Sequence, residues 1–98
     1  MGQDSSIPQV RVILTQALAD HAGGVAEHRL SGATVGEVLH ALALRHPAMA
    51  TWLWDTHGNF NSMLAVFVNR ENMGDREGLA TVLRPGDELM VITALEGG

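Results

Sequence analysis

One stretch of this chain has the periodicity of an α-helix, and strand-like segments precede and follow it. The stretch opens with a capping box, in which the Thr34 hydroxyl accepts from the backbone N–H of Glu37 and the Glu37 carboxylate returns a bond to Thr34. Apolar residues then recur on one helix face: Val35, Val38, Leu39 and Leu42. The helix is predicted to stop at about His46, because the residue before Pro47 avoids the α region. A helix of this kind must bury its apolar face against the strands around it.

The flanking segments have the patterns of β-strands. Residues 8–15 place Val10, Val12 and Leu14 at alternate positions, which predicts a strand with one buried face. A turn ending in Gly23-Gly24 follows, and residues 25–30 are predicted to form a hairpin with the first strand. Residues 63–69 are almost continuously apolar, which predicts a central strand buried on both faces.

The last strand is predicted at 88–94, after a Pro-Gly turn at 84–87. Its residues Leu89, Val91 and Thr93 point to one face, and Met90 and Ile92 point to the other.

The order of elements is strand, strand, helix, strand, short element, strand. This order predicts an α+β fold, a mixed sheet with one main helix packed on one face. The first and last strands are expected to pair in parallel at the centre, because the helix lies between two hairpin-like halves. The expected core consists of Val12, Leu14, Val38, Leu39, Leu42, Val66, Val68, Leu89 and Val91.

Three connecting segments show no clear periodicity of a helix or a strand. Residues 48–62 are predicted to be irregular and contain Trp52 and Trp54, which either cover one end of the core or bind a partner. Residues 69–78 are polar and turn-rich, and residues 79–83 form a short apolar element of undecided type.

Composition excludes several classes of function. The 98 residues fit one domain, and a formal net charge of −5 disfavours nucleic acid and anionic membranes, which need basic surfaces. The same charge suits a protein partner with a basic docking face. There are no cysteines, no apolar run of transmembrane length and no signal-peptide core, so we expect a cytoplasmic protein.

The chain from about residue 8 to residue 98 resembles the ubiquitin-like β-grasp sulfur carriers, the family that includes the molybdopterin, thiamin and cysteine-biosynthesis carriers. Four features carry the resemblance: the strand at 66–69, the segment Gly78-Leu79-Ala80-Thr81, the turn and strand start at 83–89, and an apolar strand leading to a terminal Gly97-Gly98. We therefore expect a β-grasp domain at 8–95, preceded by a flexible, polar leader at 1–7 and followed by a flexible tail at 96–98 that ends in Gly-Gly. Two departures leave the pathway open, namely the absence of a proline at Thr93 or Ala94 and the long connection at 48–62.

The resemblance also implies the chemistry. A partner enzyme would adenylate the Gly98 carboxylate with ATP, and a sulfur donor would convert it to a thiocarboxylate for an acceptor biosynthetic enzyme. Gly98 would then be the covalent carrier residue, and Gly97 would give the tail access to a narrow active site, because glycine has no Cβ. Leu95, Glu96 and Arg84 are possible partner contacts. No bound cofactor, no metal and no catalytic side chain are expected, so the chain would not be an enzyme.

Other hypotheses stay open. The same diglycine suits a ubiquitin-like modifier that is joined through Gly98 to a lysine of a target, and a non-covalent binding subunit would not need it at all.

The histidines lack the close spacing of zinc ligands and are predicted to be ordinary surface residues: His21, His28, His40, His46 and His57.

Overall fold

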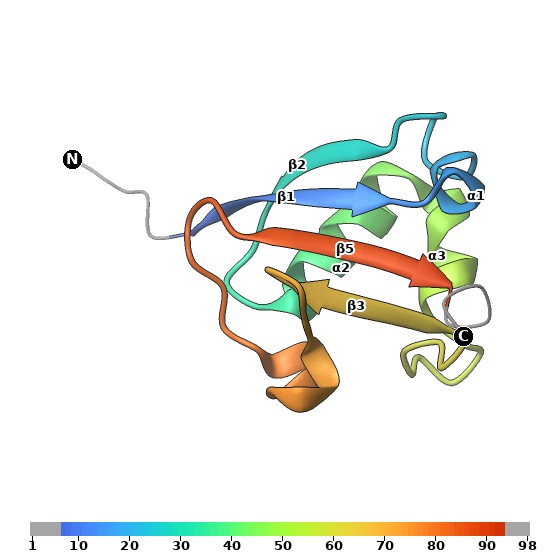
Figure 1. The fold of residues 1–98 in the computed structure, drawn as a ribbon. Coiled ribbons are helices and arrows are strands. Elements are labelled where there is room, and N and C mark those ends of the chain that lie inside the picture. Colours follow the sequence, from blue (N-terminus) through green and yellow to red (C-terminus); the bar gives the residue numbers. More distant parts are fainter. Residues whose placement is uncertain (1–6, 94–98) are drawn as a thin grey trace.

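The computed structural model describes residues 7–93, and these form one mixed sheet with helices on one side (Figure 1). The strands are β1 Gln9–Leu14, β2 Glu27–Ser31, β3 Leu64–Val68, β4 Glu71–Asn72 and β5 Glu88–Thr93. The helices are α1 Gln16–Ala19, α2 Val35–Arg45, α3 Pro47–Leu53 and the short 3-10 turns η1 Met73–Asp75 and η2 Gly78–Ala80. Of the predicted leader, residues 1–6 lie outside the described part of the chain.

The sheet has the order β2-β1-β5-β3-β4, so β5 lies at its centre. β5 pairs in parallel with β1, with Val12 opposite Leu89, which confirms the predicted contact between the first and last strands. All other neighbours are antiparallel. The expected α+β arrangement is therefore present (Figure 1).

Helix α2 begins as the capping box predicts, with one difference. The Thr34 hydroxyl accepts from the Glu37 backbone N–H at 3.2 Å. The Glu37 carboxylate accepts from the N–H of Ala33 at 2.8 Å, and not from that of Thr34. Both bonds satisfy donors at the helix start that have no partner inside the helix.

Residues 48–62 are more regular than predicted. α2 ends at Arg45, as Pro47 requires, but Pro47 is itself the first residue of α3. Proline suits this position because its fixed φ is helical and its missing N–H would have no partner there. Met49 and Leu53 then point from α3 into the core.

The core lies between the sheet and α2, α3 and α1. All nine predicted core residues are buried. Leu18, Met49 and Leu53, from the two helices that the sequence did not predict, are also fully buried. Burying one such side chain contributes roughly 1.5–3 kcal/mol before entropy is subtracted.

The prediction that β3 is buried on both faces is wrong. Leu64, Val66 and Val68 are buried, whereas Ala65 and Phe67 are only half-buried. The physical reason is that the helices cover one face of the sheet (Figure 1). Apolar residues on the other face therefore remain partly in contact with solvent.

Two histidines contact the two tryptophans, of which Trp52 lies in α3 and Trp54 directly follows it. His40 stacks on Trp54 with ring centroids 4.3 Å apart, and His21 lies 4.8 Å from the more exposed Trp52. Trp54 packs against the core, so it takes the covering role that was one of its two predicted alternatives. His28 is only 8% exposed and its Nε2 lies 2.7 Å from the Val25 carbonyl oxygen, so the prediction of a surface histidine is wrong there.

Candidate functional site

The predicted site begins where the central strand ends. β5 runs from Glu88 to Thr93, and Thr93 lies opposite Leu64 of β3. The predicted site residues that follow, Leu95, Glu96, Gly97 and Gly98, lie outside the described residues. We refer to residues 94–98, which include the predicted flexible tail at 96–98, as the tail; in the sequence they follow the central strand β5, which is described up to Thr93.

The uncovered face of the sheet carries an apolar patch beside the end of β5. Strand register places Ile13, Met90 and Phe67 in one row across β1, β5 and β3. Ala65 and Ile92 form the next row, nearer to Thr93. We refer to these five residues as the sheet patch.

Met90 is 37% exposed, and the other four members of the sheet patch are half-buried. Alternation along β5 predicted that Met90 and Ile92 face away from the core residues. It did not predict that the second face lacks a covering layer, since that depends on where the helices pack. Exposed apolar surface on a small protein is a typical binding site.

The sheet patch includes a hollow of about 390 Å³. Its apolar lining residues are Phe67, Met90 and Ile92, and its polar ones are Arg70 and Glu88. Glu88 begins β5 and Ile92 comes just before Thr93, so the hollow extends along the strand that leads to the tail.

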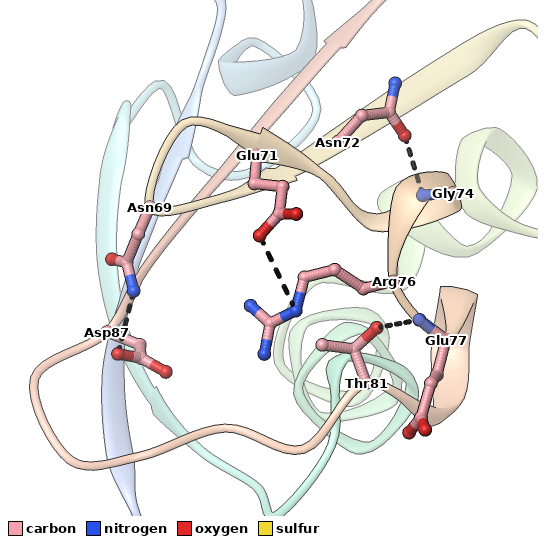
Figure 2. A network of polar contacts seen from close by, with 8 residues as sticks. All are labelled: Asn69, Glu71, Asn72, Gly74, Arg76, Glu77, Thr81 and Asp87. Atoms are coloured by element: carbon pink, nitrogen blue, oxygen red, sulfur yellow. Dashed lines mark hydrogen bonds and ion pairs between the residues drawn. The ribbon is translucent and has the colours of Figure 1, made fainter.

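A polar network fixes the end of the sheet where β5 begins (Figure 2). The Asn69 amide donates to Asp87 Oδ1 at 2.9 Å, and Asn69 Oδ1 accepts from the Glu88 N–H at 3.0 Å. Asp87 Oδ2 accepts from the Arg84 N–H at 2.8 Å, which closes the turn before β5. The β3–β4 turn is thereby tied to the start of the central strand.

The next segment of the chain is held in the same way. Arg76 Nε lies 3.9 Å from a Glu71 carboxylate oxygen, and the Asn72 side chain accepts from the Gly74 N–H at 2.7 Å (Figure 2). The Glu77 N–H donates to the Thr81 hydroxyl at 3.1 Å. These contacts order the segment that was predicted only as polar and turn-rich.

Charges near the sheet patch are unevenly paired. Arg11 lies 3.2 Å from Glu27 and 4.0 Å from Glu88, so both carboxylates have a cation beside them. Arg70 has no ion pair within 4.0 Å among residues 7–93. Arg84 is exposed and lies before β5, at the end of the strand remote from the tail, and its role as a partner contact stays a prediction.

Two further findings concern residues 7–93. They contain no group of three or more His, Cys, Asp or Glu side chains placed to hold a metal ion. In the same part of the chain, no helix has the length and apolar character needed to cross a membrane.

A five-stranded mixed sheet around one main helix, with its first and last strands parallel at the centre, defines a ubiquitin-like β-grasp protein. Solved structures of this class are similar to it. The small archaeal modifier protein 1 of Methanosarcina acetivorans has a TM-score of 0.84 and 28% identity, covering 94% of this chain and 98% of that one. An Amycolatopsis orientalis BexX/CysO complex contains a chain with a TM-score of 0.81 and 29% identity, covering 91% and 99%.

The sequence comparisons give the family. The sulfur carrier protein CysO of Mycobacterium tuberculosis is 30% identical over 91 residues, which cover 91% of this chain and 98% of the relative. The model of the ThiS family matches residues 12–98. This chain belongs to the ThiS family. The match confirms the predicted resemblance, and the curated relatives are sulfur carrier proteins rather than enzymes.

Proposed function

We propose that this protein carries sulfur as a C-terminal thiocarboxylate on Gly98. The Gly98 carboxylate attacks the α-phosphate of ATP in an activating enzyme and releases pyrophosphate. A sulfur donor at the oxidation level of sulfide then displaces AMP, and the thiocarboxylate passes its sulfur to an acceptor enzyme. ATP is bound by the activating partner, and this chain binds no cofactor of its own. All of these steps belong in the cytoplasm.

The place of Gly97-Gly98 in the sequence, shortly after the central strand β5, supports the proposal. The chain leaves the middle of the sheet at Thr93 and ends five residues later in Gly97-Gly98. Five extended residues span at most about 17 Å, which is enough to reach a nucleotide inside a partner while the folded domain stays outside. Glycine at the last two positions suits a narrow channel, because no Cβ meets its walls.

The sheet patch supports the same proposal. A partner that encloses the tail must lie against the protein surface beside Thr93, and this surface includes Ala65 and Ile92. Covering apolar side chains there removes them from water, which favours association. In this proposal the activating enzyme docks on the sheet patch while it holds the tail.

Intact mass spectrometry tests the chemistry. The protein is co-expressed with the activating enzyme and a sulfur source, and the expected result is a mass gain equal to one sulfur replacing one oxygen on the C-terminal peptide. A chain that lacks Gly98 is the matched control and should show no gain. An unchanged mass for the full chain, with an activating enzyme that is active on its own carrier, contradicts the proposal.

A second candidate function has one observation in its favour. The similar fold of a small archaeal modifier protein favours, as the second candidate, a protein modifier that is joined through Gly98 to lysines of target proteins. This function predicts isopeptide-linked conjugates that disappear when Gly97 and Gly98 are deleted. A binding subunit that acts without covalent chemistry predicts, in contrast, that the deletion leaves function intact.

A further inference from the structure

The turn between β3 and β4 carries an arginine where glycine is the favoured residue. Val68 pairs with Glu71, so Asn69 and Arg70 are the two central residues of a two-residue hairpin. Both have positive φ, 49° for Asn69 and 76° for Arg70. A type I′ turn requires this geometry, and Asn-Gly is its preferred pair. A residue with a Cβ is disfavoured in this backbone region, so the backbone gives no reason for an arginine at position 70.

The Arg70 side chain lines the hollow of the sheet patch. Phe67, Met90 and Ile92 supply the apolar part of the lining, and Glu88 lies on its polar side. Glu88 already has Arg11 at 4.0 Å. Among residues 7–93, Arg70 has no carboxylate within ion-pair distance, although Glu88 lines the same hollow, so the guanidinium beside this apolar surface is available to a partner's carboxylate.

We propose that Arg70 is a specificity-determining residue of the docking surface and that it pairs with a carboxylate of the activating enzyme. An apolar side chain of the same enzyme fills the hollow next to this pair. The inference rests on the proposed function, because it names the contact by which that partner recognises the carrier. Arginine suits the role because its planar guanidinium binds a carboxylate through two parallel hydrogen bonds.

An ion pair between Arg70 and the activating enzyme would fix the orientation of the carrier on that enzyme. Arg70 lies with Glu88 at the start of β5, whereas the tail follows Thr93 at the end of the strand. Five residue steps along a strand separate these ends by about 17 Å. An ion pair at one end and the enclosed tail at the other fix the orientation of the carrier, which apolar contact alone leaves free.

Charge favours this partner chemistry as well. The chain has a net charge of −5, so a generally basic partner is attracted from a distance. A carboxylate within that basic surface is repelled by most of the carrier and attracted by Arg70. Local complementarity of this kind selects one docking register and rejects others.

The test is the affinity of the activating enzyme for the parent chain and for Arg70→Gly, measured by calorimetry at low and high salt. Arg70→Gly creates the Asn-Gly pair that the turn prefers, so its thermal midpoint should equal or exceed that of the parent. Its affinity at low salt should fall by about tenfold or more, since a buried charge contact is lost. Arg70→Glu should bind still more weakly, and high salt should reduce its deficit.

Arg29→Ala is the matched control. Arg29 is an exposed arginine on the same face of the sheet, but it lies on the edge strand β2, opposite Arg11 and outside the hollow. The substitution removes the same charge and should leave the affinity unchanged. If Arg29→Ala weakens binding as much as Arg70→Gly does, the loss is not specific to the Arg70 contact, and the inference is wrong.

The outcomes separate the two proposals. If the parent is bound and adenylated and Arg70→Gly binds equally well, the role of Arg70 is overturned and the proposed function stands. A lower thermal midpoint for Arg70→Gly would also overturn the inference, because the backbone argument would be wrong. If the parent is neither bound nor adenylated by the activating enzyme, the proposed function fails and the inference fails with it.

Discussion

At the scale of single residues, Asn69 and Arg70 share the same unusual backbone conformation in one turn but differ in what their side chains contribute. Asn69 and Arg70 both have positive φ. Asparagine tolerates this region, and its side chain joins the turn to Asp87 and Glu88. Arginine gains no such contact among residues 7–93. The two positions should therefore respond to substitution with opposite signs.

Asn69→Ala should lower the free energy of unfolding by about 1–3 kcal/mol, because two hydrogen bonds are lost and alanine tolerates positive φ less well. Urea denaturation followed by circular dichroism measures the change. Arg70→Gly is the matched comparison in the same turn and should be neutral or stabilising by about 1 kcal/mol. A loss of stability of equal size in both variants would show that the turn, and not the Asn69 network, determines the effect.

At the scale of elements, the sequence predicted those whose start and stop residues act locally. α2 is an example, because Thr34 and Glu37 cap it and Pro47 ends it within one or two residues of the prediction. α3 was missed because Pro47 was interpreted only as a terminator, although proline also begins helices. The spacing of Met49 and Leu53, four residues apart and both buried, was the available signal.

The candidate site was less predictable for a related reason. The alternation of β5 separates Leu89 from Met90, but which face stays uncovered depends on the packing of α2 and α3. The hollow also needs Arg70, which comes from a different strand connection. A single sequence does not show that Arg70 and Met90 meet, since no local pattern connects residues 20 positions apart.

The Thr34 N-cap of α2 is predicted to stabilise the folded protein. Thr34→Ala removes the acceptor for the Glu37 N–H and should lower the free energy of unfolding by about 1 kcal/mol. Thr51→Ala is the matched control, because the exposed Thr51 hydroxyl donates to the Ala48 carbonyl oxygen inside α3 and, among residues 7–93, caps no helix start. It should change stability by less than about 0.5 kcal/mol. Equal effects in thermal melts of the two variants would argue against a special role for the cap.

At the scale of the whole molecule, the two faces of one sheet have different tasks. The inner face buries the core under the helices (Figure 1), and the outer face leaves the sheet patch in partial contact with solvent. β5 contributes to both, because Leu89 points inward and Met90 points outward. Folding and docking should therefore be separable by substitutions at adjacent residues.

Leu89→Asn and Met90→Asn test this separation with the same chemical change. Leu89 is fully buried, so an amide there has no water and leaves a cavity, and stability should fall by about 3 kcal/mol or more. Met90 is 37% exposed, so Met90→Asn should lower the free energy of unfolding by less than about 1 kcal/mol. The same substitution should weaken binding of the activating enzyme to the sheet patch. The measurements are a denaturant melt and the rate of Gly98 adenylation for each variant.

The informative result is the Met90→Asn protein, which should remain folded and yet be adenylated more slowly at limiting carrier concentration. The deficit should disappear at saturating carrier, because docking and not the tail chemistry is impaired. Met63→Asn provides the control, since Met63 is an exposed methionine that lies just before β3 and outside the hollow. If Met90→Asn is adenylated as fast as the parent at every carrier concentration, the activating enzyme binds the tail without docking on the sheet patch, and the predicted role of the outer face in docking is wrong.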